Sequence, residues 1–144
     1  MATVTSLVVN DGQATPVAHT FLPAKTTADY ALFEDRVSGI YMGFNKWSVL
    51  VKRPDQRDAD RNARGRNILI TQTLEFPQLE IISGTTASGY VAAPSVAFRP
   101  QVEVRWKLPE QCTQQNRADL HALLTGHLTH ASNKAVIVSL DMFY

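Results

Sequence analysis

The segment QVEVRWKL, residues 101–108, alternates polar and apolar side chains without a break. Successive side chains of a β-strand point to opposite faces, so this pattern predicts a strand with one polar and one apolar face. Pro109 follows and ends the strand, because proline has no backbone N–H to donate. A chain with such a strand must form a sheet and cover only one of its faces.

Two earlier segments show the same period of two, each with one exception per face. In residues 46–53 the apolar side carries Trp47, Val49 and Val51. In residues 66–76 one side carries mostly apolar residues and the other mostly polar ones such as Thr71 and Thr73. Residues 54–65 between them are polar and dense in charge. We therefore predict two strands joined by a charged loop.

The N-terminal segment predicts a β-hairpin, residues 1–22. Asn10-Asp11-Gly12 separates two strand-like pieces, and such residues tolerate the positive φ of tight turns. The next residues, LPAKTTAD, are turn-like, and YALFEDRVSGIYMGF fits either a strand or irregular structure. With the alternating segments, an antiparallel sheet is expected over residues 30–108.

After Pro109 the sequence changes to the period of a helix. Apolar residues share one face of the helix expected from residue 113 onward: Leu120, Leu123, Leu124 and Leu128. Thr113 and Asn116 are both plausible N-caps. The final AVIVSLDMFY fits a second helix or a strand. Strands followed by helices predict an α+β fold, taken as one domain over 1–144 with a helical region at 113–144.

This sheet has too few helices to cover its apolar face within one chain. A dimer in which the helices of each protomer cover the sheet of the other would bury both apolar faces. It would also merge the polar faces into one surface, which carries Lys46, Ser48, Lys52, Thr71, Thr73, Arg105 and Lys107. Lysine and threonine on an open β-surface offer contacts to phosphates and base edges, so RNA is the expected ligand.

Other classes of function have little support in the 144 residues. The four histidines lack ligand spacing with acidic residues, so we interpret them as surface or interface residues and expect no metal. No nucleophile elbow or phosphate-binding loop is present, and no enzyme or cofactor is expected. The start of the chain lacks a signal-peptide pattern and no segment has the length of a membrane span, which favours a soluble protein of a cytoplasm.

The chain resembles the coat proteins of single-stranded RNA bacteriophages, the leviviruses, over essentially its full length. The resemblance rests on the order of the segments LVVNDGQATPVAHTF, KWSVLVKR, NILITQTLEFP, SGTTASGYVAAP, VEVRWKLPE and RADLHALLTGHL, with a terminal tyrosine. It implies a five-stranded antiparallel sheet behind an N-terminal hairpin, two C-terminal helices that clasp the partner subunit, and dimers that assemble into an icosahedral shell.

The resemblance also implies the positions of functional residues. RNA contacts would fall on Lys46, Ser48, Leu50, Lys52, Thr71, Thr73, Glu75, Gln101, Glu103 and Arg105. The loop that changes conformation between non-equivalent sites of the shell would contain Gly84, Gly89 and Tyr90. The dimer interface would use Leu120, Leu123, Leu124 and Leu128. Two positions depart from the family pattern: Leu50 stands where a small polar side chain would help to grip a base, and Glu103 brings a negative charge to the RNA face.

The resemblance implies partners as well. These are a second copy of the chain, the other dimers of the shell, single-stranded viral RNA including a genomic hairpin whose binding represses translation, and a maturation protein in the virion. No membrane partner is expected, and assembly would take place in the bacterial cytoplasm. The alternative is a dimeric RNA-binding regulator that uses the same sheet and does not assemble.

Overall fold

The computed structural model describes residues 5–54, 66–80 and 93–142. The chain divides into two compact units, residues 1–54 with 68–107 and residues 55–67 with 108–144. The expected single domain over 1–144 stays a prediction. The elements are β1 (Leu7–Asn10), β2 (Ala18–Thr26), β3 (Tyr30–Asp35), the 3₁₀ helix η1 (Tyr41–Gly43), β4 (Asn45–Lys52), β5 (Asn67–Glu75), β6 (Gln78–Leu79), β7 (Val96–Phe98), β8 (Gln101–Pro109), α1 (Gln114–Thr129) and α2 (Ala131–Val138).

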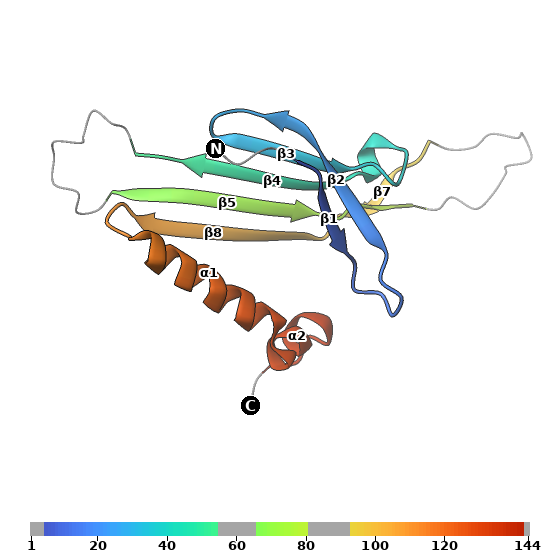
Figure 1. The fold of residues 1–144 in the computed structure, drawn as a ribbon. Helices are drawn as coiled ribbons and strands as arrows, with labels where there is room; N and C mark the ends of the chain where they lie inside the picture. The colour runs from blue at the N-terminus through green and yellow to red at the C-terminus, as the bar shows by residue number, and fades with distance from the viewer. Residues whose placement is uncertain (1–4, 55–65, 81–92, 143–144) are drawn as a thin grey trace, which may run out of the picture. The chain divides into compact units, whose positions relative to one another are not determined.

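The strands form a six-stranded sheet in the order β1-β2-β3-β4-β5-β8, and β6 and β7 form a small second sheet (Figure 1). The three alternating segments of the sequence are β4, β5 and β8. The ambiguous segment after residue 30 begins with a strand, β3. The expected α+β class, with an N-terminal hairpin, an antiparallel sheet and two C-terminal helices, is confirmed.

The sheet gains its sixth strand because β2 is long enough to pair twice. Its first half pairs with β1, with Leu7 opposite Phe21, and its second half pairs with β3, with Leu22 opposite Glu34. The register shifts between Pro23 and Lys25. A proline cannot donate a ladder hydrogen bond, so a bend at this position costs the sheet little.

The loop of the hairpin is organised by a carboxylate. Asp11 Oδ1 accepts hydrogen bonds from the backbone N–H groups of Gln13 at 3.2 Å and Val17 at 2.9 Å, and the Asp11 N–H donates to the Val17 carbonyl at 3.0 Å. The predicted hairpin is confirmed. The hydrogen bonds of Asp11, and not a positive φ at Gly12, organise its turn. Among the described glycines the left-handed φ belongs to Gly39, at 68°, and not to Gly12.

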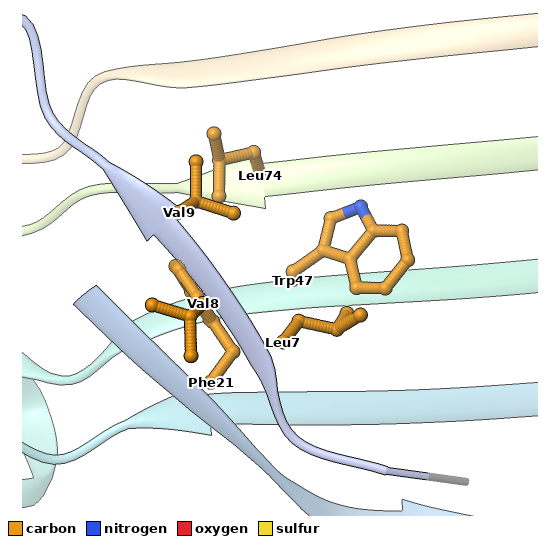
Figure 2. Close-up of a pocket in the computed structure, with 6 residues that line it drawn as sticks. All are labelled: Leu7, Val8, Val9, Phe21, Trp47 and Leu74. Carbon is orange, nitrogen blue, oxygen red and sulfur yellow. The ribbon is translucent and has the colours of Figure 1, made fainter. Parts of the chain in front are cut away.

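The hairpin crosses the apolar face of the sheet. Leu7, Val8 and Val9 of β1 lie over Trp47 of β4 and Leu74 of β5, as Figure 2 shows. Together with Phe21 these side chains line an apolar groove of about 320 Å³. The core of this unit is small: Phe21 and Phe33 are buried, and the Phe33 ring packs against the Trp47 ring at 5.1 Å.

The second unit contains the helices. Thr113 is the N-cap of α1, since its side chain accepts from the Asn116 N–H at 3.2 Å, which decides between the two predicted caps. In the described part of the final segment only the first four residues, AVIV, are helical, at the end of α2. The side chain of His130 caps α2 by accepting from the Ser132 N–H. Among the residues that the structure describes, no helix is long and apolar enough to cross a membrane.

Candidate nucleic-acid interface

The register of the sheet places the predicted residues of β4 and β5 on one face. Side chains of directly paired residues in an antiparallel sheet point to the same side. Lys46 pairs with Glu75, Ser48 with Thr73, Leu50 with Thr71, and Lys52 with Leu69. All seven predicted positions of these two strands therefore share one face, and Trp47, Val49 and Val51 lie on the other.

Strand β8 adds its polar side to the same face. Trp106 Nε1 donates to Gln72 Oε1 at 3.2 Å, and Gln72 pairs with Val49, so Trp106 belongs to the apolar side. By alternation Gln101, Glu103, Arg105 and Lys107 belong to the polar side. Near β8 a hollow of about 650 Å³ is lined by residues of this face, among them Lys52, Thr71 and Arg105, and by Ile70 and Trp106.

Sequence reasoning missed the contribution of β2 and β3. Tyr30 pairs with Leu50, Leu32 with Ser48 and Glu34 with Lys46, and Lys25 of β2 pairs with Leu32. In YALFED both faces carry an apolar residue, Leu32 on one and Phe33 on the other, so period two did not separate a strand from irregular structure. Lys25 was not predicted to lie in a strand because its neighbours in the sequence are turn-forming residues. The candidate face thus comprises Lys25, Tyr30, Leu32, Glu34, Lys46, Ser48, Leu50, Lys52, Leu69, Thr71, Thr73, Glu75, Gln101, Glu103, Arg105 and Lys107.

Carboxylates balance the cations at the Lys46 end of the candidate face. Lys46 is half-buried between the paired positions of Glu34 and Glu75, and Glu34 is buried. Arg36 Nη2 lies 3.4 Å from Glu34, and Arg99 Nη1 lies 3.9 Å from Glu75. Three cations thus accompany two carboxylates. Removing Lys46 would take away one of the positive charges that compensate the buried Glu34 carboxylate. Lys46 therefore stabilises the fold in addition to any contact with a ligand.

The Lys52 end is more open and more positive. Lys52, Arg105 and Lys107 are exposed, and one carboxylate, Glu103, accompanies them. Arg105 Nε donates to the Glu103 carboxylate, and this hydrogen bond raises the pKa of the Arg105 guanidinium further above its high ordinary value. The hydrogen bond directs the Arg105 guanidinium toward Glu103. The negative charge of Glu103 is therefore largely compensated by Arg105.

A second polar cluster joins the hairpin to the sheet. The Asp35 carboxylate on β3 is buried, lies 2.6 Å from His19 Nδ1 of β2 and accepts from Asn45 Nδ2 of β4 at 2.9 Å. His19 Nε2 also lies 3.6 Å from Asp11 of the hairpin loop. The hydrogen bond with Asp35 raises the pKa of His19, and the backbone hydrogen bond from Val17 lowers the pKa of Asp11. His19 thereby connects two carboxylates from separate segments.

The other predicted residues divide into two groups. Gly84, Gly89 and Tyr90 lie outside the described residues, as does most of the charged loop of residues 54–65. Leu120, Leu123 and Leu128 are exposed in α1 and Leu124 is half-buried. Their role in an interface stays a prediction. In the described part of the chain no group of His, Cys, Asp and Glu is arranged to hold a metal ion.

Solved structures share this arrangement. The virus-like particle of bacteriophage ESE058 is 31% identical, covers 99% of this chain and 100% of its own, and has a TM-score of 0.87. The particle of bacteriophage NT-214 is 24% identical over 99% of this chain and 100% of its own, with a TM-score of 0.78. A bacteriophage coat protein described as an unassembled, RNA-binding dimer is 16% identical over 99% of both chains, with a TM-score of 0.63. A comparison with curated protein sequences finds no match.

A hairpin, a sheet with one polar face and two C-terminal helices define the class of protein as a phage shell subunit. The family model of the levivirus coat proteins matches residues 2–144, and the chain belongs to this family. It is a structural protein of the virion capsid and not an enzyme. The resemblance found in the sequence is confirmed.

Proposed function

We propose that the protein dimerises, that the dimers assemble into an icosahedral shell, and that the candidate face binds single-stranded RNA on the inside of that shell. The observation that carries the RNA part is the register of the sheet. The register puts four exposed cations on one surface of the sheet, Lys25, Lys52, Arg105 and Lys107, while the opposite surface is apolar. A charged face and an apolar face on one sheet suit a polyanion on one side and protein on the other.

The dimer is supported by the exposure of the helices. No residue of α1 or α2 is buried, although both carry large apolar side chains such as Leu123 and Ile137, each 62% exposed. The groove lined by Trp47 and Leu74 is open and apolar. A second copy of the chain offers surfaces of both kinds, and burying them against each other would stabilise the pair by about 25 cal/mol per Å².

RNA binding is tested best with lysines whose removal leaves the fold alone. We expect Lys52→Ala with Lys107→Ala to weaken binding to a genomic hairpin and to a scrambled RNA equally, because interactions with phosphates carry no sequence information. The slope of log affinity against log salt should fall by roughly 0.7 for each phosphate that the variant no longer neutralises. Filter binding across a salt series, at protein concentrations below assembly, measures both quantities.

The matched control removes two exposed cations elsewhere, Arg53 and Lys134. Arg53 forms an exposed ion pair with Asp29, at 2.6 Å, and its loss costs the fold little. This control should keep the parental slope. If the Lys52 and Lys107 variant keeps it as well, RNA does not bind the candidate face, and the charged loop of residues 54–65 becomes the better candidate.

Operator recognition is the finer part of the proposal. Thr71 and Thr73 are uncharged and lie in the middle of the candidate face, so their replacement by valine should change discrimination between the genomic hairpin and the scrambled RNA. The salt slope should stay nearly constant. Equal discrimination by the Thr71→Val, Thr73→Val variant and the parent would remove translational repression through this face from the proposal.

Shell formation separates this proposal from the alternative of a regulator that does not assemble. Electron microscopy of the protein expressed alone in bacteria should show particles of uniform size. Replacing Gly84 and Gly89 by valine should leave dimers intact and change or abolish the particles, because glycine allows one sequence to follow more than one backbone path. Unchanged particles would rule out this loop as the switch. We also propose that the virion contains a maturation protein and that assembly takes place in the cytoplasm of the bacterial host.

A further inference from the structure

We infer that Tyr41, beside the candidate face, is a stacking site for an unpaired RNA base. This inference rests on the proposed function, since it assigns a further contact to RNA that already lies on that face. Tyr41 belongs to η1, outside every strand of the sheet, and it is 62% exposed. No position in η1 was among the residues predicted to contact RNA.

The turn that carries Tyr41 is fixed by close packing. The Gly43 N–H donates to the Ile40 carbonyl at 2.8 Å, and a Cβ added at Gly43 would lie 2.8 Å from Leu79 Cδ1 of β6. Gly43 therefore allows η1 to lie directly against β6. A ring presented by such a turn loses little conformational freedom when a ligand binds it, which favours affinity.

The orientation of the ring is set by two neighbours. Lys46 Nζ lies 4.1 Å from the centroid of the Tyr41 ring, and the Phe44 ring meets it nearly edge-on with centroids 5.6 Å apart. Lys46 points from β4 to the candidate face, so the ring stands next to that face at its Lys46 end. A cation over one side of an aromatic ring stabilises it by about 0.5–1 kcal/mol at exposed sites and leaves the remaining surface for a base.

The charges around Tyr41 suit a nucleotide. Lys46 has Glu34 and Glu75 at its paired positions, and these carboxylates are near Arg36 and Arg99, whose side chains are 54% and 52% exposed. The two arginines can meet phosphates while the ring meets the base. Proteins that bind single-stranded RNA combine cations for the backbone with aromatic rings for the bases.

The test compares RNA with a backbone that has no bases. We expect Tyr41→Ala to weaken binding of a short single-stranded RNA by about 5- to 150-fold, the range for loss of one stacked base. An abasic oligonucleotide of equal length should bind the parent and the variant equally, and the salt slope should not change. Tyr41→Phe keeps the ring and should bind RNA within about twofold of the parent.

Met42→Ala is the matched control, because Met42 lies in the same turn, is 43% exposed and has no aromatic ring. It should leave the binding of both oligonucleotides unchanged. The inference is overturned if Tyr41→Ala binds RNA like the parent, if it loses affinity for both oligonucleotides equally, or if it changes only particle yield. The last result would assign this turn, with exposed Ile40 and Met42, to contacts between copies of the protein.

The same oligonucleotides separate this inference from the proposed function. If the Lys52 and Lys107 variant loses salt dependence and Tyr41→Ala keeps full affinity, RNA binds the candidate face and only the stacking site is wrong. If neither variant differs from the parent, the face itself is wrong, and the stacking site falls with it.

Discussion

The N-terminal hairpin is held by polar contacts within its own chain, whereas the C-terminal helices bury none of their side chains. In the hairpin, His19 reaches the buried Asp35, and Phe21 enters the small core. In the helices, Leu120, Leu123 and Leu128 remain exposed. The hairpin finds its partners in the same polypeptide, whereas the helices expose apolar side chains that we propose a second copy covers. Four substitutions or conditions test this contrast.

The largest effect is expected in the helices. Leu124→Asp would place an unpaired charge in the proposed interface, at a cost of several kcal/mol, so dimers and particles should be lost. Sedimentation velocity measures the change. Ala122 lies two residues earlier, on nearly the opposite side of α1, and Ala122→Asp should leave dimers intact. A well-folded soluble monomer from Leu124→Asp would contradict the view that folding requires the partner.

The next effect is expected where the hairpin meets the sheet. Asp35→Ala would leave His19 and Asn45 without their shared acceptor, and breaking such a buried pair costs about 3 kcal/mol. Urea unfolding measures this loss. Asp29 is also ion-paired but exposed, so Asp29→Ala should cost less than about 1 kcal/mol. Equal costs for the two substitutions would show that the buried cluster does not anchor the hairpin.

A smaller effect is expected at the start of α1. Thr113→Ala removes the oxygen that accepts from the Asn116 N–H and should cost about 1 kcal/mol of unfolding free energy. Thr113→Ser keeps that oxygen and should behave like the parent in the same urea titration. A loss in Thr113→Ser as large as that in Thr113→Ala would assign the effect to the methyl group and not to the cap.

The smallest effect is expected from pH, because neutral His19 can still donate from Nδ1 to Asp35 and loses only its charge. The pKa of His19 is raised by the hydrogen bond with Asp35, so its stabilising charge is fully present below the unfolded pKa of about 6.5 and is lost as pH rises through the folded pKa. The pKa of Asp11 is lowered by the Val17 N–H, so its contribution is lost as pH falls through the folded pKa, below about 3.9.

Unfolding free energy measured from pH 5 to 9 should therefore decline on the alkaline side. In His19→Gln this decline should disappear, because glutamine does not titrate. The groups that face His19 are Asp11 from the hairpin loop, Asp35 from β3 and the Phe76 ring, 6.2 Å away. If His19→Gln shows the same alkaline decline as the parent, another group causes it.

Alternation in the sequence predicted the strands whose two faces differ. β4, β5 and β8 each contrast polar with apolar side chains, and period two is sufficient for such strands. β3 was left open because Phe33 and Leu32 are both apolar although they face opposite sides. The final segment was left open for the same reason, since AVIV is apolar throughout and fits a helix or a strand.

The periodicity of the sequence could not predict the contacts that position residues from separate segments. The link from His19 to Asp35 and Asn45 joins three strands, and no spacing in the sequence connects them. Lys25 reaches the candidate face because of the register shift after Pro23. Tyr41 meets Lys46 of β4 from a turn in which Gly43 lies close to Leu79 of β6. In each case the position follows from how separate segments pair, which the local sequence does not encode.

The contrast between hairpin and helices is tested most directly by unfolding the protein at several concentrations. The two tryptophans, Trp47 and Trp106, lie in the sheet strands and report on the sheet by fluorescence, while far-ultraviolet circular dichroism reports on the helices. If the folded unit is a dimer, each tenfold rise in concentration should raise the free energy of unfolding by about 1.4 kcal/mol, and both signals should shift together. Midpoints that stay the same at every concentration would show that one chain folds alone and would contradict the need for a partner.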